Sequence, residues 1–468
     1  MSRTATLATA RSGAVDRART LIYSLLIVAF VLLQVFGLRA AAPALSVLTI
    51  AAILVSLPAV SRIALVLSLA FLVSGTAMMW RSGATLAAYV GAYGQMAHLV
   101  ALFCLVPLLA VPVRLGGYGD AISTVLRGRV GRTTRLNMLI TSLAYACGSF
   151  MTMAAIPIMI SSLRPVAENY PLRDRVHFIA TSITCSHLLS MLWSPVSGVL
   201  AAILTGLKVS WFEIVPVMLP LSVAVLLVNW LLFRVVEKNS AVTLPPMPDA
   251  ADAEQVATAT RLLLQLGLVI LALVAVVVAL EQWLRLGLVT VVVLTVIPFT
   301  LAWSGLLGRS RQYVSVARQD MGMRLPRMAE IFAIFLCGGF FANALNLSGY
   351  VHEANMGLLA LRELLGARAF LISLPVATML ASLAGMHPLV AMAVLAEALK
   401  PEVLGIAAWQ LAIALTGGAL LTYMLGPFSG TLGLVSAFTN VSTWRLAWWN
   451  LPYAATFTVL LLAALWLM

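Results

Sequence analysis

The sequence predicts an all-α polytopic membrane protein built from two inverted-topology repeats, each with a re-entrant helical hairpin and a broken transmembrane helix. Three observations lead to this prediction: the composition, the positions of the arginines and an internal repeat. Hydrophobic residues make up 62% of the 468 residues and charged residues 10%, and the mean hydropathy is +1.03. Soluble proteins hold roughly half apolar and about a quarter charged residues. This chain is therefore suited to a bilayer.

The net charge of +13 comes largely from arginines that gather in short stretches. These are Arg3, Arg11, Arg17 and Arg19, then Arg127, Arg129, Arg132 and Arg135, and then Arg309, Arg311, Arg318, Arg324 and Arg327. Basic loops beside membrane segments stay on the cytoplasmic side, and they can also contact anionic lipids. We therefore expect a multi-pass protein of a bacterial-type inner (plasma) membrane, with a cytoplasmic amino terminus and no nucleic-acid partner.

The first unit, residues 1–135, is expected to hold four scaffold crossings and a cytoplasmic basic loop. A crossing needs about 17–25 apolar residues. Suitable runs lie near residues 20–38, 43–59, 62–79 and 87–112. The first run lacks a small-residue cleavage site after a short apolar core, which indicates an uncleaved anchor. Four crossings return the chain to the cytoplasm at 114–135.

The second unit, residues 136–236, begins with an apolar stretch between two basic ends, Arg135 and Arg164. This stretch, 136–163, is too short for two full crossings. A re-entrant hairpin that enters from the cytoplasm and returns to it fits both the length and the charges. Non-helical backbone at its tip requires surrounding protein or a watery cavity. A broken segment at 176–205 then crosses outward, and 213–236 crosses back.

A polar, proline-rich linker at 237–258 joins the halves in the cytoplasm. The third unit, 259–366, adds three scaffold crossings and an amphipathic helix on the outer surface. These elements are expected at 259–280, 285–306, 328–346 and 347–365.

The last unit, residues 367–468, repeats the order of the second. It holds a hairpin at 367–398 that enters from outside, a broken segment at 403–440 and a crossing at 450–468. Five crossings separate the two hairpins. An odd number turns the second repeat upside down relative to the first, which is the inverted topology that alternating access uses.

The internal repeat begins in the two broken segments and continues into the crossing that follows each, where Pro, Gly and Ser recur at one offset of 232 positions. The first copy has Pro195, Ser197, Gly198, Val209, Ser210 and Pro220, and the second has Pro427, Ser429, Gly430, Val441, Ser442 and Pro452. Six matches without a gap are not expected by chance. Paired helices interrupted at matching places mark the substrate site of secondary transporters.

Further motifs accompany the repeat: Ile-Pro-Ile at 156–158, proline breaks at 194–198 and 426–431, and polar turns at 209–212 and 441–444. With these motifs the chain resembles the ion transporter superfamily, and within it the divalent anion/sodium symporter family. The resemblance covers residues ~136–236 and ~367–468. It implies an elevator mechanism, in which the hairpins and broken helices of each monomer in a homodimer move against a scaffold.

The hairpin tips depart from that family, which holds sodium and substrate carboxylates with Ser-Asn-Thr at each tip. Counting back from Ile156 places Cys147, Gly148 and Ser149 at the first tip. Matching the second hairpin places Gly385, Met386 and His387 there. Neither tip has an asparagine.

We expect both tips and both breaks to meet near mid-membrane. Helix ends there attract anions, freed carbonyls can hold a cation, and hydroxyls can donate or accept hydrogen bonds. The alternative is that these residues only let helices kink or pack. The candidate binding residues are Cys147, Gly148, Ser149, Thr152, Ser194, Pro195, Ser197, Gly198, Gly385, Met386, His387, Gly426, Pro427, Ser429, Gly430 and Thr431.

Ionisable residues at membrane depth are functional candidates because burying them is costly. His387 at the second tip and His187 before the first break are the candidates for proton coupling, since histidine titrates near neutral pH. The alternative coupling ion is sodium. A histidine at either place could also have a purely structural role, as a neutral side chain hydrogen-bonded to a nearby carbonyl. His98, Asn343 and Asn346 fit helix contacts better than solute binding.

Signatures of soluble catalysis are missing from the sequence. It has no P-loop, no His-Glu-x-x-His, no Gly-x-Ser-x-Gly and no Cys/His cluster, and its four scattered cysteines fit small core residues. We therefore expect no enzyme and no cofactor beyond a coupling ion (H⁺ or Na⁺). The expected function is secondary transport of a small polar or anionic solute, with an organic anion such as a carboxylate favoured. Alternatives are transport or export of an inorganic oxyanion or lipid phosphate, and a membrane enzyme or subunit acting on a lipid-linked substrate.

Overall fold

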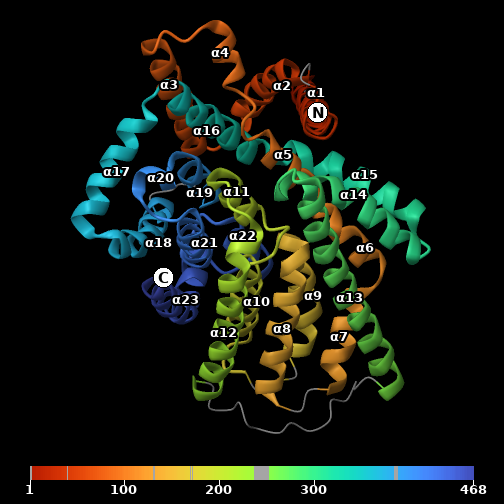
Figure 1. Cartoon of the computed structure of the whole chain (residues 1–468). Helices are drawn as coiled ribbons and strands as arrows, with labels where there is room; N and C mark the ends of the chain where they lie inside the picture. Colours follow the sequence, from red (N-terminus) through yellow and green to blue (C-terminus); the bar gives the residue numbers. More distant parts are fainter. Residues whose placement is uncertain are drawn as a thin grey trace.

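The computed structural model describes residues 3–38, 41–129, 132–168, 170, 172–236, 252–383 and 388–468. Within these ranges every element of three or more residues is helical (Figure 1). Eleven helical stretches in the described residues are long and apolar enough to cross a membrane. The predicted class, an all-α polytopic membrane protein, is confirmed.

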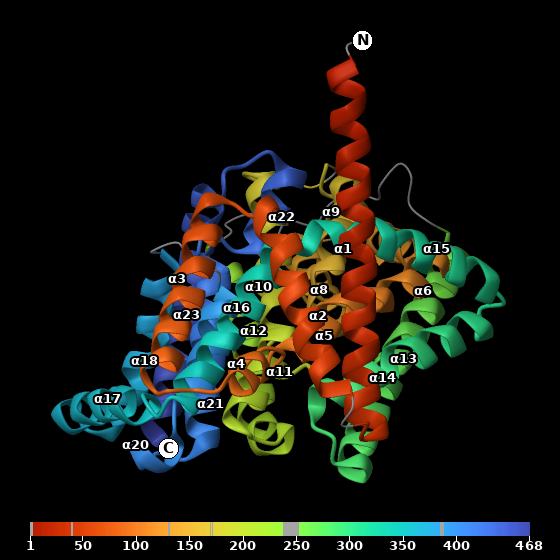
Figure 2. The ribbon, with the colours of Figure 1, turned by 90° about the horizontal axis from the view of Figure 1, so that it is seen from above.

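Helices long enough to cross a membrane form at the amino-terminal apolar runs. They are α1 (Arg3–Phe36), α2 (Ala41–Ser56) with the short turn η1 (Leu57–Ala59), α3 (Arg62–Arg81), and a run of α5 (Ala97–Leu105), η2 (Val106–Leu109) and α6 (Ala110–Leu115). The fourth crossing begins later than the predicted residue 87, because the separate helix α4 (Leu86–Gly91) and a turn precede it. Helix α1 packs against α2, and α3 packs against α16 (Ala329–Leu347) (Figure 2).

Two helices occupy the basic stretches, where the sequence analysis expected loops. They are α7 (Tyr118–Arg129) and α15 (Ser310–Arg324). Helix α7 buries Ile122 and Leu126, one turn apart, and packs against α9 (Ala155–Ala167) and α13 (Ala253–Leu284). An ion pair between Arg114 and Asp320 ties α6 to α15, and Arg324 lies 3.8 Å from the same carboxylate. Apolar spacing at helical period was thus present within the basic sequence.

The first hairpin consists of α8 (Thr133–Met151), η3 (Thr152–Ala154) and α9 (Ala155–Ala167). The whole stretch Thr133–Ala167 is apolar enough for one long span, but the chain reverses at Thr152, whose φ is 49°. Helices α8 and α9 then lie side by side (Figure 1), and α10 packs against both. The broken segment follows as α10 (Arg175–Ser190) and α11 (Gly198–Leu207), and α12 (Trp211–Val236) runs after it.

The second group of scaffold helices begins inside the predicted linker. The Gln255 side chain accepts from the Asp252 amide at 3.4 Å at the start of the first helix, while residues 237–251 lie outside the described ranges. The helices are α13 (Ala253–Leu284), α14 (Leu288–Leu306), η4 (Leu325–Met328), α16 and α17 (Val351–Leu365). Helix α17, predicted as an outer amphipathic helix, bends by 117° from the helix that follows it.

The second hairpin is formed by α18 (Ala367–Leu383) and α19 (Pro388–Ala398), which contact each other. Asn355 of α17 fixes its end, donating to the Ala398 carbonyl at 2.9 Å and accepting from the Lys400 amide at 3.0 Å. The remaining helices are α20 (Pro401–Leu404), α21 (Ala408–Leu425), α22 (Gly430–Thr439) and α23 (Thr443–Leu467).

The side chains on the outside of these helices are largely apolar. Val66 and Val73 of α3 are 68% and 67% exposed, and Leu268 of α13 is 68% exposed. Contiguous apolar surface of this kind is unusual in water, and helices that are apolar on every side are typical of membrane spans. The exposed faces therefore suit contact with lipid.

The repeat found in the sequence is also a repeat of backbone geometry. Ser197 and Ser429 each cap a helix of 10 residues, α11 and α22. The backbone amide of each serine donates a hydrogen bond of 3.0 Å to the carbonyl three residues before it. Lys208 and Asn440 end these helices with φ of 55° and 57°. Each short helix packs against the hairpin of the other half: α11 contacts α19, and α22 contacts α9. We call α8–α12 and α18–α23 the core unit, and α1–α7 and α13–α17 the scaffold unit.

Candidate functional site

The first break, between α10 and α11, packs against the end of α8, the first arm of the first hairpin. Ser194 and Ser197 are 1% and 2% exposed. The Ser194 hydroxyl donates to the backbone carbonyl of Ser149 in α8. Pro195 occupies the turn between α10 and α11. A methyl group added at Gly198 would lie 2.5 Å from the Phe103 ring of α5, so this break also touches the scaffold unit.

The second break has the same turn but different side-chain contacts. Pro427 lies in the turn, and the Ser429 hydroxyl donates to the Tyr423 carbonyl at 3.1 Å. A methyl group added at Gly426 would lie 2.8 Å from the Ser382 hydroxyl of α18, which places the second hairpin arm against this break. The Ser382 and Thr431 hydroxyls are buried, and neither has a hydrogen-bond partner.

The first hairpin turns later than predicted. Cys147, Gly148 and Ser149 lie in the last turn of α8 rather than at the tip. The tip is at Thr152, where a positive φ ends α8, so alignment to the family motif gave a position a few residues too early. A methyl group added at Gly430 would lie 3.1 Å from the Met153 side chain. The tip of the first hairpin therefore meets the start of α22 in the other half.

His187 lies beside Gly148, where α10 crosses α8. A methyl group added at Gly148 would lie 2.7 Å from the His187 Nδ1 atom and 2.7 Å from the Ser190 hydroxyl. His187 is 2% exposed, and its Nδ1 atom has no hydrogen-bond partner. A buried nitrogen without a partner is costly. This position fits a group that meets a water molecule or a solute.

Other predicted candidates fall outside the site or outside the described residues. Gly385, Met386 and His387 lie in the undescribed stretch 384–387 between α18 and α19. The His98 Nδ1 atom is 2.9 Å from the Gln95 carbonyl. The Asn343 side chain donates to the Ala92 carbonyl at 3.1 Å, and the Asn346 side chain donates to the Ala342 carbonyl at 2.9 Å. Asn343 thus joins α16 to the segment before α5, whereas His98 and Asn346 bond to carbonyls three and four residues earlier in the chain.

Sequence reasoning missed three residues that belong to this region. Ser382 and Thr184 carry buried hydroxyls without partners. Asn450 of α23 donates to the Met424 carbonyl at 3.0 Å and lies 3.4 Å from the Cys185 sulfur, so it links α23 to α21 and α10. A signal for Thr184 existed in its spacing of three from His187 on one helix. Asn450 falls outside the repeat frame, because position 218 in the first half is Met218.

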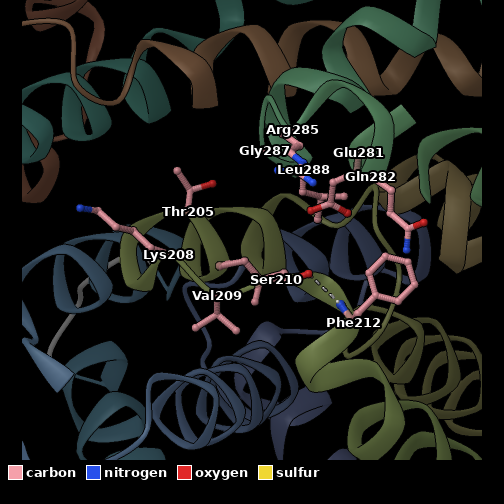
Figure 3. Close-up of a pocket in the computed structure, with 11 residues that line it drawn as sticks. Thr205, Lys208, Val209, Ser210, Phe212, Glu281, Gln282, Arg285, Gly287 and Leu288 are labelled. Carbon is pink, nitrogen blue, oxygen red and sulfur yellow. Dashed lines mark hydrogen bonds between the residues drawn. The ribbon is translucent and has the colours of Figure 1, made fainter. Parts of the chain in front are cut away.

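Two cavities lie along the boundary between the core and scaffold units. One, of about 390 Å³, separates the α11–α12 turn from the α13–α14 turn, with Thr205 and Ser210 facing Glu281 and Gln282 (Figure 3). The Glu281 Oε2 atom there is buried without a partner. The other, of about 480 Å³, lies between α7 and α9. In the described part of the chain, no three His, Cys, Asp or Glu side chains gather as a metal site would require.

Comparison with known proteins identifies structural neighbours only. No family model matches the chain, and no curated protein matches it. The YdaH transporter of Alcanivorax borkumensis is similar in structure, with a TM-score of 0.56 and 16% identity over 81% of this chain and 86% of that one. MtrF of Neisseria gonorrhoeae, described with a class of antimetabolite efflux pumps, has a TM-score of 0.53 and 14% identity over 78% and 80%. The chain therefore shares the fold of these solved transporters.

Proposed function

We propose that this chain is a secondary active transporter, not an enzyme, and that it binds its solute where the hairpins and the helix breaks meet. The paired break supports this proposal most strongly. Ser197 and Ser429 start two matched helices, and buried polar atoms of His187, Ser382 and Thr431 near them lack partners. Polar groups inside a membrane protein are expensive and mark solute or ion pathways. The fold shared with YdaH and MtrF agrees with this proposal.

We propose that the two repeats have opposite orientations in the membrane and that the core unit moves as one body. Because α11 packs on α19 and α22 packs on α9, neither repeat can move without the other. The cavities beside α7 and beside α13 separate core from scaffold at two places. This arrangement supports an elevator motion in a homodimer. The basic stretches support an inner-membrane protein with a cytoplasmic amino terminus.

The solute proposed is small and polar or anionic, and a carboxylate is favoured. The amino-terminal ends of α11 and α22 carry partial positive charge, which favours an anion. Inorganic oxyanions and lipid phosphates share this chemistry and are the alternatives. Because MtrF is described with efflux pumps, export is a direction to test beside uptake.

Thermal-shift screening of the purified protein tests this proposal first. We expect a carboxylate to raise the melting temperature more than sulfate, phosphate or a lipid phosphate, and Thr431→Val to reduce that rise. The solute found is then followed in proteoliposomes under a pH gradient and, separately, a sodium gradient. Solute accumulation driven by either gradient supports transport. A solute that binds but never crosses, under either gradient and in either direction, would overturn it.

A membrane enzyme or subunit acting on a lipid-linked substrate is the second candidate. The cavity between α7 and α9 favours it, because Arg114, Asp120 and three serines line that space. Incubation with a lipid-linked phosphate and analysis of the products tests it. Conversion that is lost in Asp120→Asn but retained in Thr431→Val would place the activity at this cavity.

A further inference from the structure

Glu397 occupies a junction between the core and scaffold units. It lies near the end of α19, and its carboxylate accepts a hydrogen bond of 3.0 Å from the Gln95 side chain, which precedes α5 in the scaffold. Gly206 of α11 permits the close approach, because a methyl group there would lie 2.8 Å from the Ala396 side chain and 3.0 Å from the Glu397 amide. Helices α19 and α11 lie side by side next to α5 (Figure 1).

This contact differs from other polar contacts between the two units. Ser162 of α9 donates to the Gly119 carbonyl of α7, and Asn355 bonds to backbone atoms of Ala398 and Lys400. Those bonds have backbone partners and do not change with pH. The bond between Gln95 and Glu397 joins two side chains, and one of them can take up a proton.

The carboxylate of Glu397 is partly buried and forms no described ion pair. The charged groups acting on it are Lys400 and Lys208. The Lys400 ammonium donates to the Glu397 backbone carbonyl at 3.4 Å rather than to the carboxylate. Burial raises the pKa of Glu397, against the opposing effects of Gln95, Lys400 and Lys208. Its helix is not among the candidate membrane spans.

The remaining helices that pack on α19 place their charged groups elsewhere. Glu330 of α16 accepts from Ser61, and Arg368 of α18 lies over the Trp466 ring. Arg362 of α17 extends toward Gly405. Helix α21 contains no Asp, Glu, Lys, Arg or His. Glu397 is therefore the acid of α19 that bonds to the scaffold residue Gln95, with Lys208 and Lys400 as its cationic neighbours.

We propose that Glu397 is the proton-binding residue that couples the core unit to the scaffold unit. The inference rests on the proposed transport function and deepens its coupling step. When ionised, Glu397 accepts a charge-assisted hydrogen bond from Gln95 and holds the units together. A proton taken from water onto the carboxylate neutralises it, weakens this bond and releases the core unit. The energy available is limited to the difference in proton affinity between the two states.

A distance measurement tests this coupling without knowledge of the solute. Spin labels on Thr205→Cys and Gln282→Cys report across the cavity in Figure 3, since these exposed residues lie on opposite walls. The four native cysteines, all buried and free, are replaced by serine. The full-length protein in liposomes is measured between pH 5 and 9. We expect the distance distribution to shift with pH.

In this assay Glu397→Gln should abolish the pH shift and hold the low-pH distribution at every pH. Gln95→Ala should move the midpoint upward by about one pH unit, because the ionised carboxylate loses its donor. Glu402→Gln, which changes a nearby exposed acid, should leave the midpoint unchanged. If Glu397→Gln does not fold, Gln95→Ala alone decides the matter.

Four results would overturn the inference: no pH shift in the parent protein, a shift retained in Glu397→Gln, an unchanged midpoint in Gln95→Ala, or loss of the shift in His387→Gln. Loss of the shift in His387→Gln would assign the proton to the hairpin tip instead. Failure of the transport proposal is distinguished separately, because it appears as a normal pH shift without solute movement in proteoliposomes.

Discussion

The two breaks share one backbone geometry but differ in how their polar groups are satisfied. In the first, Ser194 bonds to the Ser149 carbonyl of the neighbouring hairpin arm. The equivalent residue in the second is Gly426, 232 positions later. The nearby Ser382 hydroxyl has no partner there. A further pair, Val199 and Thr431, adds a second unpartnered hydroxyl to the second break only.

This difference separates two roles within one repeat. Proline, serine and glycine at matched positions set the path of the backbone, whereas unmatched residues set the chemistry. At the first break the Ser194 hydroxyl is bonded, and the unpartnered atoms include the Trp193 Nε1 and the nearby His187 Nδ1. The second break instead keeps two unpartnered hydroxyls, at Ser382 and Thr431. We therefore expect the second break to contribute more of the binding free energy of a solute.

The largest effect is expected from Gly426→Ala. An added methyl group would lie 2.5 Å from the Thr422 carbonyl, a backbone atom that cannot rotate away. Overpacking of this kind costs about 1–3 kcal/mol, so both the melting temperature and transport should fall. Gly148→Ala should cost less, since it first meets the His187 and Ser190 side chains. Gly433→Ala is the control, because nothing lies within 4 Å of its added methyl.

Melting temperatures and initial transport rates of the three variants check this order. A larger loss in Gly148→Ala than in Gly426→Ala would mean that the first break is the tighter one, and would reverse the comparison.

A smaller effect is expected from Thr431→Val, which keeps the shape of the side chain and removes its hydroxyl. If this hydroxyl bonds to the solute, its loss costs about 0.5–1.5 kcal/mol and raises KM roughly two- to twelve-fold. Stability should not fall, because the hydroxyl has no protein partner. The control is Thr416→Val, whose hydroxyl already donates to the Ala412 carbonyl at 2.6 Å. Equal KM values in both variants would remove Thr431 from the site.

The sequence was informative about the frame of the fold and less so about the side chains that face each other. Apolar runs and the 232-residue offset predicted most of the long helices and both breaks, since each depends on residues close in sequence. The tip at Thr152 was misplaced because it depends on one φ angle rather than on a motif. Helix α7 was not predicted because its arginines indicated a polar loop, although Ile122 and Leu126 have the spacing of a helix with one apolar face. Contacts such as Gln95 with Glu397, 302 residues apart, depend on tertiary packing and leave no local pattern.

The smallest difference in uptake is expected between alanine variants of two serine pairs. One pair, Ser197 and Ser429, starts the short helices, and the other, Ser210 and Ser442, lies in the turns after them. Ser197 and Ser429 are buried caps that accept from Leu200 and Leu432 at 3.4 and 3.3 Å. Loss of a cap typically costs about 1 kcal/mol, so Ser197→Ala and Ser429→Ala should lower the melting temperature and weaken uptake. Their repeat partners in the following turns are Ser210 and Ser442.

Ser210 accepts from the Phe212 amide at 3.3 Å, and Ser442 caps α23 at 3.4 Å from Arg445, but neither is buried. Water can replace an exposed hydroxyl, so Ser210→Ala and Ser442→Ala should change uptake less. Among the buried pair, Ser429→Ala should be the more severe, because Ser429 also donates to the Tyr423 carbonyl and Ser197 makes no such second bond in the described contacts. Equal, small losses of uptake at all four serines would favour a packing role for the repeat. Equal losses at Ser197 and Ser429 alone would show that the extra bond at the second break contributes nothing measurable, and the proposed asymmetry would then depend on Thr431 and Ser382.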